Sequence, residues 1–155
     1  MHFQTYNCDL EEAATKNLQE LVNKKVNFSL PDFDYIGESY SKRNGELAAD
    51  SLSFTFQEVI MNWMAPFEKD QYRNRYSVHY KKASQVVAAV VESVGCAAQS
   101  DHENMRLSHV LCLYEPGGNL LSAATYEVGE ACSRCPSEGS SCEDGLCVPK
   151  KKEIK

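Results

Sequence analysis

Apolar residues recur at helical spacing in the first part of the chain. The stripe consists of Leu10, Ala14, Leu18, Leu21 and Val22. The segment Asp9-Leu-Glu-Glu12 has the spacing of a capping box, in which Asp9 caps a helix and Glu12 reaches back to the cap. The pattern therefore predicts a helix that begins near Asp9 and fades near Lys25, before Pro31.

The middle of the chain shows weaker patterns. Residues 32–40 contain Asp, Tyr and Gly and predict a loop. Residues 47–64 mix apolar and polar positions and predict a second helix, which Pro66 ends or closely follows. Residues 71–80 are polar and aromatic and predict irregular structure, whereas a third helix is expected from Lys82 to about Val87.

Two apolar segments rich in β-formers follow, Val90–Ala98 and Leu107–Tyr114, and the polar residues 99–104 join them. This arrangement predicts an antiparallel hairpin with a long loop. After the turn Pro116-Gly-Gly-Asn119, the region from Cys132 onward is dominated by Ser, Gly, Pro and Cys. We therefore expect a core strand that leads into a cross-linked tail.

The composition narrows the class of protein. A chain of 155 residues suits one domain with a small appendage. The net charge is −6 and the only basic block is Lys150-Lys-Lys152, which argues against nucleic acid as a partner. Three lysines are fewer than the usual ~4–8 of a lipid-binding cluster, so we interpret them as a solvated tail. No apolar stretch approaches the roughly 18–20 residues of a membrane span.

The seven cysteines predict a secreted protein. The start, Met1-His-Phe-Gln4, has no charged-then-apolar leader, so no signal peptide is expected in it, and we interpret the chain as beginning inside a longer precursor. Cys132, Cys135, Cys142 and Cys147 have the spacing Cys-x2-Cys-x6-Cys-x4-Cys. This pattern suits two disulfides in any of three pairings, or alternatively a four-thiolate zinc site. The short separation of its halves favours disulfides.

Several short segments occur in a characteristic order along the chain. They are Tyr6-Asn-Cys8, Gly37-Glu38-Ser39-Tyr40, Trp63, Ser84-Gln85-Val86-Val87, Val94-Gly95-Cys96-Ala97 and Cys112-Leu-Tyr-Glu-Pro-Gly-Gly-Asn119. In this order they resemble the CAP superfamily, and within it the secreted venom-allergen-like proteins of parasitic nematodes. The segment from Cys112 to Asn119 is the most specific of them.

The resemblance implies an α+β fold, an α-β-α sandwich with a small antiparallel sheet between helical layers. The family's first helix, which carries a His-Asn pair, is expected to be missing. The implied organisation is a partial CAP domain over residues 1–128, a Cys-rich hinge over 129–148 and a basic tail over 149–155. Many members of the family have a cleft with two histidines and two acidic residues, a ligand set that suits zinc.

The resemblance also implies that this cleft is degenerate here. Lys82 stands 14 positions before Cys96, where the family has a histidine, and Pro66 stands where it has the second acidic residue. Glu38, Lys82 and Gln85 remain as remnant cleft residues. A protonated lysine has no lone pair to give to a metal, so an ion pair with Glu38 is expected in the metal's place and no cofactor is predicted.

Two residues are candidate substitutes in this cleft. His79 precedes the motif by three positions, and a local shift brings it into the cleft; otherwise it is an exposed loop residue. Glu68 lies two residues beyond Pro66 and is a candidate for the missing acid; otherwise it is solvated. His102 and His109 flank the predicted hairpin loop and are expected at the surface.

The resemblance further implies the disulfides Cys96–Cys112, Cys132–Cys142 and Cys135–Cys147. It leaves Cys8 as an unpaired or intermolecular thiol. Asn27-Phe-Ser29 is a glycosylation sequon, which matters only if the chain enters the secretory path.

These observations predict a secreted, non-enzymatic CAP-domain protein with a host-interaction or immunomodulatory role. Its partner is an unknown protein or lipid, and the surface with the Cys-rich hinge is expected to bind it. The alternative is a carrier of sterols or fatty acids, and a metal-dependent hydrolase is the weakest candidate. The loss of a helix from a three-layer sandwich exposes an apolar face, so marginal folding or a dimer is also expected.

Overall fold

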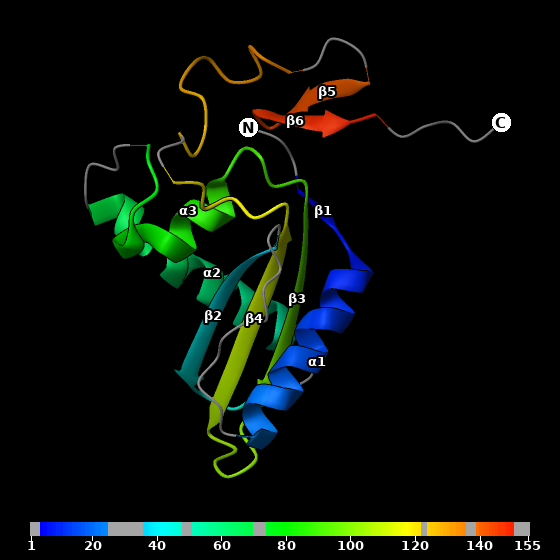
Figure 1. Cartoon of the computed structure of the whole chain (residues 1–155), viewed down its shortest axis with the longest axis vertical. Helices are drawn as coiled ribbons and strands as arrows, with labels where there is room; N and C mark the ends of the chain where they lie inside the picture. Colours follow the sequence, from blue (N-terminus) through cyan, green and yellow to red (C-terminus); the bar gives the residue numbers. More distant parts are fainter. Residues whose placement is uncertain are drawn as a thin grey trace, which may run out of the picture.

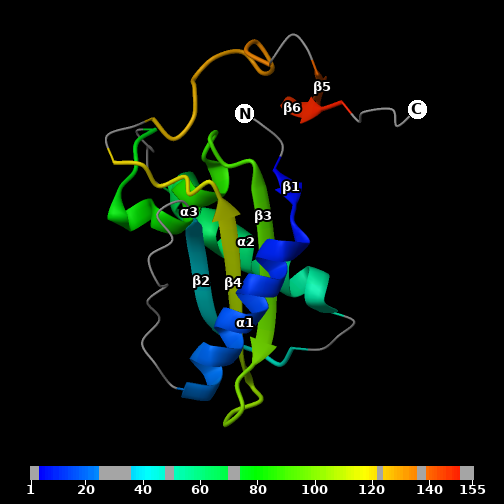
Figure 2. The same ribbon diagram turned by 45° about the vertical axis from the view of Figure 1, so that its right-hand side comes forward.

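A four-stranded sheet lies between helices on both of its faces (Figures 1 and 2). The computed structural model describes residues 4–24, 36–47, 51–69, 74–121, 124–135 and 139–150. The strands are β1 (Thr5–Tyr6), β2 (Gly37–Asn44), β3 (Ser93–Ser100) and β4 (Leu107–Glu115), in the spatial order β1-β3-β4-β2. Helix α1 (Cys8–Lys24) covers one face, and α2 (Leu52–Lys69) with the short α3 (Lys81–Val87) covers the other. The predicted α-β-α sandwich is confirmed.

Strand β4 connects the two halves of the core. Side chains alternate between the faces of a strand, and β4 is buried along nearly its whole length. Leu111 and Leu113 pack with Leu10, Ala14 and Leu18 of α1. Val110, Cys112 and Tyr114 pack on the opposite face with Val59 and Trp63 of α2. The apolar run in the sequence is therefore a central strand that is covered by helices on both sides.

The start of α1 differs from the prediction in its cap. The side chain of Asn7 accepts hydrogen bonds from the backbone nitrogens of Asp9, at 2.8 Å, and Leu10, at 3.3 Å. Asn7 is therefore the cap, and Asp9 lies in the first turn, where its carboxylate favours the positive end of the helix. The assignment of Asp9 as the cap was wrong, since its own N–H is one of the donors that the cap must satisfy.

Strand β2 occupies part of a region that was predicted as a loop. Its eight residues pair antiparallel with β4, from Gly37 opposite Tyr114 to Asn44 opposite Leu107. The prediction was wrong for residues 37–40, whereas residues 31–35 lie outside the described residues. Strand β2 is an edge strand, and there the pairing with a buried neighbour stabilises a sequence that has little strand character of its own.

Helix α2 runs through Pro66 and ends at Lys69. Pro66 was expected to end this helix, and it does not. A proline removes one backbone hydrogen bond and crowds the preceding turn, and packing of the apolar face of α2 against the sheet offsets this local cost. The predicted hairpin is confirmed as β3–β4, and the third helix is confirmed with its start at Lys81.

The C-terminal region forms a second, two-stranded sheet of β5 (Ser140–Glu143) and β6 (Leu146–Pro149). Asp144 and Gly145 connect them, and both have positive φ angles, as a two-residue hairpin turn requires. Disulfides join Cys132 to Cys142 and Cys135 to Cys147. A third disulfide joins Cys96 to Cys112 across β3 and β4. These are the three pairs that the resemblance implies.

Candidate functional site

The remnant cleft residues come together where the start of α3 meets β2. Glu38 of β2 forms an ion pair with Lys81, with 3.6 Å between Oε1 and Nζ. Lys82 instead donates a hydrogen bond to the hydroxyl of Ser41, at 3.3 Å. Successive helical residues point about 100° apart, so the two lysines reach different residues of β2. The lysine that pairs with Glu38 is therefore Lys81, one position before the residue that the family spacing selected.

Burial changes the acidity of two groups in this cluster. Burial raises the pKa of Glu38, and the ammonium of Lys81 opposes that rise. Burial also lowers the pKa of Lys82, and the charge of Lys81 lowers it further. The two lysines thus repel each other, and in the described ranges only Lys81 has a carboxylate beside it.

Gln85 is fully buried beside the cluster. A Cβ atom added at Gly37 would overlap its side-chain amide, and one added at Gly118 would lie 3.2 Å from Nε2. In the described part of the chain, both amide atoms of Gln85 and Oε2 of Glu38 are buried without a hydrogen-bond partner. Gly37 is therefore required so that Gln85 can pack against the strand next to Glu38.

Of the two candidate substitutes, His79 can be placed in the structure and Glu68 cannot. His79 lies exposed in the 3-10 helix η2 (Val78–Tyr80), and no hydrogen bond or ion pair between described residues joins it to Glu38. The side chain of Glu68 lies outside the described residues. The described ranges contain no group of three or more His, Cys, Asp or Glu residues that is arranged to hold a metal ion. The group paired with Glu38 is the ammonium of Lys81, which has no lone pair and so does not fit a divalent cation.

Two further predicted site residues are Cys8 and Asn27. Cys8 is the first residue of α1, and its thiol is free and exposed. Asn27 of the glycosylation sequon lies outside the described residues.

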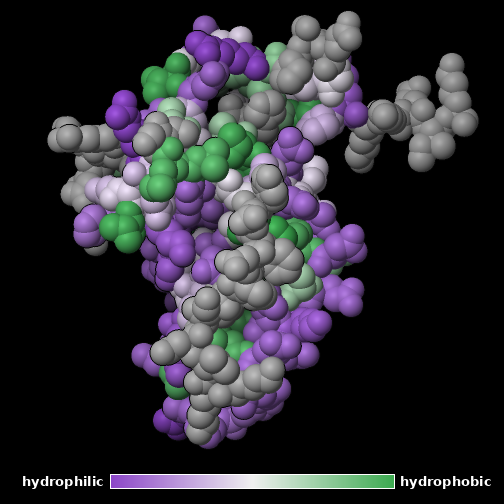
Figure 3. Space-filling model, in the orientation of Figure 1, coloured by the Kyte–Doolittle hydropathy of each residue, from purple (hydrophilic) through white to green (hydrophobic). Residues whose placement is uncertain are grey.

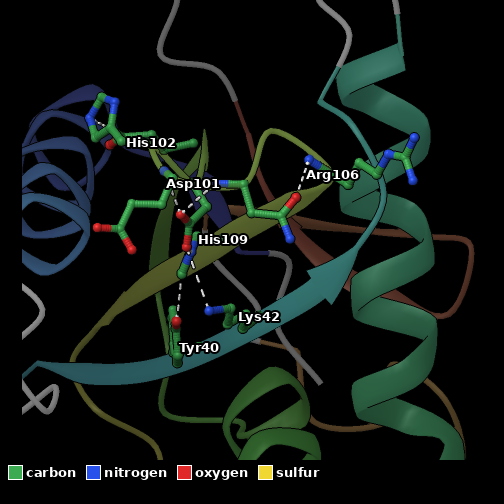
Figure 4. Close-up of polar contacts among 9 residues, drawn as sticks. Tyr40, Lys42, Asp101, His102, Arg106 and His109 are labelled. Carbon is green, nitrogen blue, oxygen red and sulfur yellow. Dashed lines mark hydrogen bonds and ion pairs between the residues drawn. The ribbon is translucent and has the colours of Figure 1, made fainter.

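Tyr40, His109 and Asp101 form a second polar cluster, which the sequence did not predict (Figure 4). The Tyr40 hydroxyl lies 2.7 Å from His109 Nδ1, and His109 Nε2 lies 3.1 Å from Asp101 Oδ2. His109 was expected at the surface but is only 5% exposed. It occupies the same face of β4 as Leu111 and Leu113, so strand alternation was the signal that pointed to its burial. His102 is exposed, as expected.

Asp101 holds this cluster together at the end of the hairpin. Its pKa falls from 3.8 to about 2, chiefly because His109 donates a hydrogen bond to it and because the backbone N–H groups of Glu103 and Asn104 do the same. Lys42, at 3.5 Å, adds a favourable charge. A depressed pKa means that the folded state binds fewer protons than the unfolded state in this pH range.

We therefore predict an acid-sensitive contribution of Asp101 to stability. The contribution is complete above about pH 4 and is lost as the pH falls through about 2. Urea denaturation at a series of pH values should show that Asp101→Asn destabilises the fold at neutral pH and that the difference from the wild type shrinks in acid. Glu92→Gln, at an exposed position, is the matched control. A difference that is constant across pH would contradict the prediction.

The fold and the motifs have known relatives. The model of the cysteine-rich secretory protein family (CAP) matches residues 2–114. Human peptidase inhibitor 15 is 40% identical over 132 residues, which cover 74% of this chain and 50% of that protein. The zebrafish (Danio rerio) peptidase inhibitor 15-A is 30% identical and is matched over 74% of this chain and 49% of that protein. The chain thus spans about half the length of these curated relatives.

Among solved structures, BmVAL-1 has the same fold. It aligns with a TM-score of 0.78 and 22% identity, over 97% of this chain and 78% of that chain. At this identity the likeness concerns the fold alone. The family match covers most of the chain, and the resemblance noted in the short motifs agrees with it. The chain therefore belongs to the cysteine-rich secretory protein (CAP) family.

Proposed function

We propose that this chain is an extracellular, non-enzymatic CAP-domain protein that acts by binding a partner. The observation that carries the proposal is the pair of lysines at the cleft. Lys81 forms an ion pair with Glu38, the one acidic residue that keeps its family identity, and the neighbouring Lys82 donates to Ser41, so the charge next to Glu38 is an ammonium group. Within the described cleft residues, this arrangement favours neither a metal-activated water nor a general base for hydrolysis.

The extracellular part of the proposal is supported by the disulfides. Three disulfides link six of the seven cysteines, which is usual for proteins of oxidising compartments. The family description also names secretory proteins. Among the described residues, no helix has the length and apolar character that a membrane span requires.

Exposed apolar residues occur in the segment before α3 and in the segment after β4. Val78 is 71% exposed and Leu121 is 80% exposed, and Leu120 and Val128 are also largely exposed. Figure 3 shows hydrophobic surface at this end of the molecule. Exposed apolar surface that is contiguous is typical of interaction sites, so these residues are candidates for a contact with a partner. A host-interaction role, with the CAP domain over residues 1–128, the hinge over 129–148 and the tail over 149–155, is the finer part of this proposal.

The carrier function has less support. A pocket of about 540 Å³ lies at the opposite end of the sheet from α3, and it is lined by Asn44, Gly45, Glu46, Asn104, Arg106 and Leu107. Sterol and fatty-acid sites are lined mainly by apolar side chains, whereas Leu107 is the one lining residue here with a large apolar side chain. Lipid extraction of the purified protein followed by mass spectrometry separates the two functions, since a stoichiometric sterol or fatty acid would favour the carrier.

A zinc titration tests the proposal directly. We expect isothermal titration calorimetry of the Cys8→Ser variant to show no saturable zinc binding, because the charges of Lys81 and Lys82 oppose a cation next to Glu38. The Cys8→Ser background removes the one free thiol, which would bind zinc on its own. Saturable binding that disappears on Glu38→Gln, and persists in the control Glu92→Gln, would overturn the proposal.

A further inference from the structure

Among the described residues, no carboxylate forms an ion pair with the ammonium group of Lys82. The carboxylate of Glu38 pairs with Lys81, and its pKa responds to Lys81 and not to Lys82. Within the described residues, the hydroxyl of Ser41 is the group that accepts a hydrogen bond from Lys82. Two positive charges and one negative charge thus leave one unit of positive charge here, on a chain whose net charge is −6.

The hydroxyl of Ser41 has a proton left to donate. Its oxygen accepts a hydrogen bond from the indole N–H of Trp63, at 2.7 Å, and another from Lys82, at 3.3 Å. A serine oxygen has two acceptor lone pairs, so both are in use and the O–H remains as a donor. In the described part of the chain no acceptor for that proton is found. Trp63 is 4% exposed, so a buried ring holds Ser41 in place.

The backbone that carries Lys82 is also held in place. The side-chain amide of Asn119 donates to the carbonyl of Lys81, at 2.8 Å. The hydroxyl of Ser84 lies 2.7 Å from the carbonyl oxygen of the same Asn119 side chain. The turn after β4 thereby anchors the first turn of α3. The donors of Lys82 and Ser41 are therefore arranged before any ligand binds, which reduces the entropic cost of binding.

We propose that Lys82 and Ser41 form a binding site for an oxyanion, namely a sulfate or phosphate ester group of a partner. A tetrahedral oxyanion offers several acceptor oxygens, and hydrogen bonds between it and a charged donor are among the strong ones. The inference rests on the proposed function, in which lysine ammonium groups lie among the cleft residues. It assigns an anionic ligand to the cleft in which the family resemblance implies a divalent cation.

The single tryptophan of the chain provides the readout, because Trp63 bonds directly to Ser41. Sodium sulfate is titrated against the protein at constant ionic strength, with sodium chloride as the balancing salt, and Trp63 emission is followed. We expect a saturable change with sulfate and none with chloride alone. Lys82→Gln should weaken the apparent affinity about tenfold or more, since it removes the charged donor.

Lys16→Gln is the matched control, because it removes the same charge from an exposed position on α1. It should retain the affinity of the wild type, and circular dichroism establishes that both variants are folded. An equal loss in the two variants, or an equal response to sulfate and chloride, would overturn the inference.

Two further arms separate the possible outcomes. Glucose 6-sulfate and glucose 6-phosphate, titrated in turn, decide whether the ester is a sulfate or a phosphate. If sulfate, glucose 6-sulfate and glucose 6-phosphate all give no saturable change and zinc also does not bind, this inference alone is overturned. Saturable zinc binding that depends on Glu38 overturns the proposed function as well.

Discussion

Gly95→Ala should destabilise the fold by about 3 kcal/mol or more, at the upper end of the cost of overpacking a core. Gly95 lies in β3, where α1 crosses the sheet. A Cβ atom at this position would lie 2.5 Å from the carbonyl carbon of Leu10 and closer still to the amide nitrogen of Glu11. Both contacts are with helix backbone, so no side-chain rotation relieves them. Relief requires that α1 move away from the sheet and from Leu111 and Leu113.

Urea denaturation followed by circular dichroism measures this effect. Gly129→Ala is the matched control, because a Cβ atom there would meet only the Ser133 hydroxyl, at 3.5 Å. The control should change the free energy of unfolding by no more than about 0.5 kcal/mol, as is usual for surface substitutions. Similar midpoints for the two variants would show that α1 adapts to a side chain at position 95.

Removal of both hinge disulfides should unfold the hinge and leave the sandwich intact. Strands β5 and β6 have four residues each, and an isolated hairpin of this size is marginally stable in water. The disulfides close loops with sequence separations of 10 and 12 residues. Loop closure of this length contributes about 3 kcal/mol for each bond in the chain-entropy account. The hinge therefore depends on covalent bonds more than on packing.

Hydrogen exchange of the variant with Cys132, Cys135, Cys142 and Cys147 all replaced by Ser measures this prediction. The amides of β5 and β6 should lose their protection, while those of β4 keep the protection that they have in the wild type. The β4 amides in the same sample serve as the internal control. Retained protection in β5 and β6 would mean that packing alone stabilises the hinge.

The elements with strong periodicity could be predicted from the sequence. Leu10, Ala14 and Leu18 recur at helical spacing because one side of α1 is buried, and that burial determines which residues are apolar. The hairpin β3–β4 was predictable for a similar reason, since its central strand is covered on both faces. In these elements, the local pattern and the tertiary environment agree.

Strand β2 was not predictable in the same way. Its residues Gly37–Asn44 are mostly polar, and it is a strand because β4 offers a complete row of backbone partners. The information for this strand thus lies in β4, about seventy residues later in the chain. A prediction from local pattern cannot weigh a partner at such a distance.

The details of the candidate site were partly predictable. The motif order identified Glu38, Gln85 and a lysine in place of a histidine. Which lysine pairs with Glu38 depends on the direction in which each side chain leaves the first turn of α3, and one residue changes that direction by about 100°. Sequence spacing alone does not determine such a direction. His109 was expected at the surface because it lies near the hairpin loop. Its position two residues before Leu111 places it on the buried face of β4.

The disulfide between Cys96 and Cys112 also determines how the chain would respond to mechanical tension. The two residues are directly paired in β3 and β4, with 4.1 Å between their Cα atoms. A chain pulled from its two ends would transmit the force through this bond. The hairpin loop and the outer halves of both strands would then bear no load. The segment between the cysteines, whose sequence separation is 16, would be withheld from extension, which shortens the fully stretched chain by roughly 55 Å.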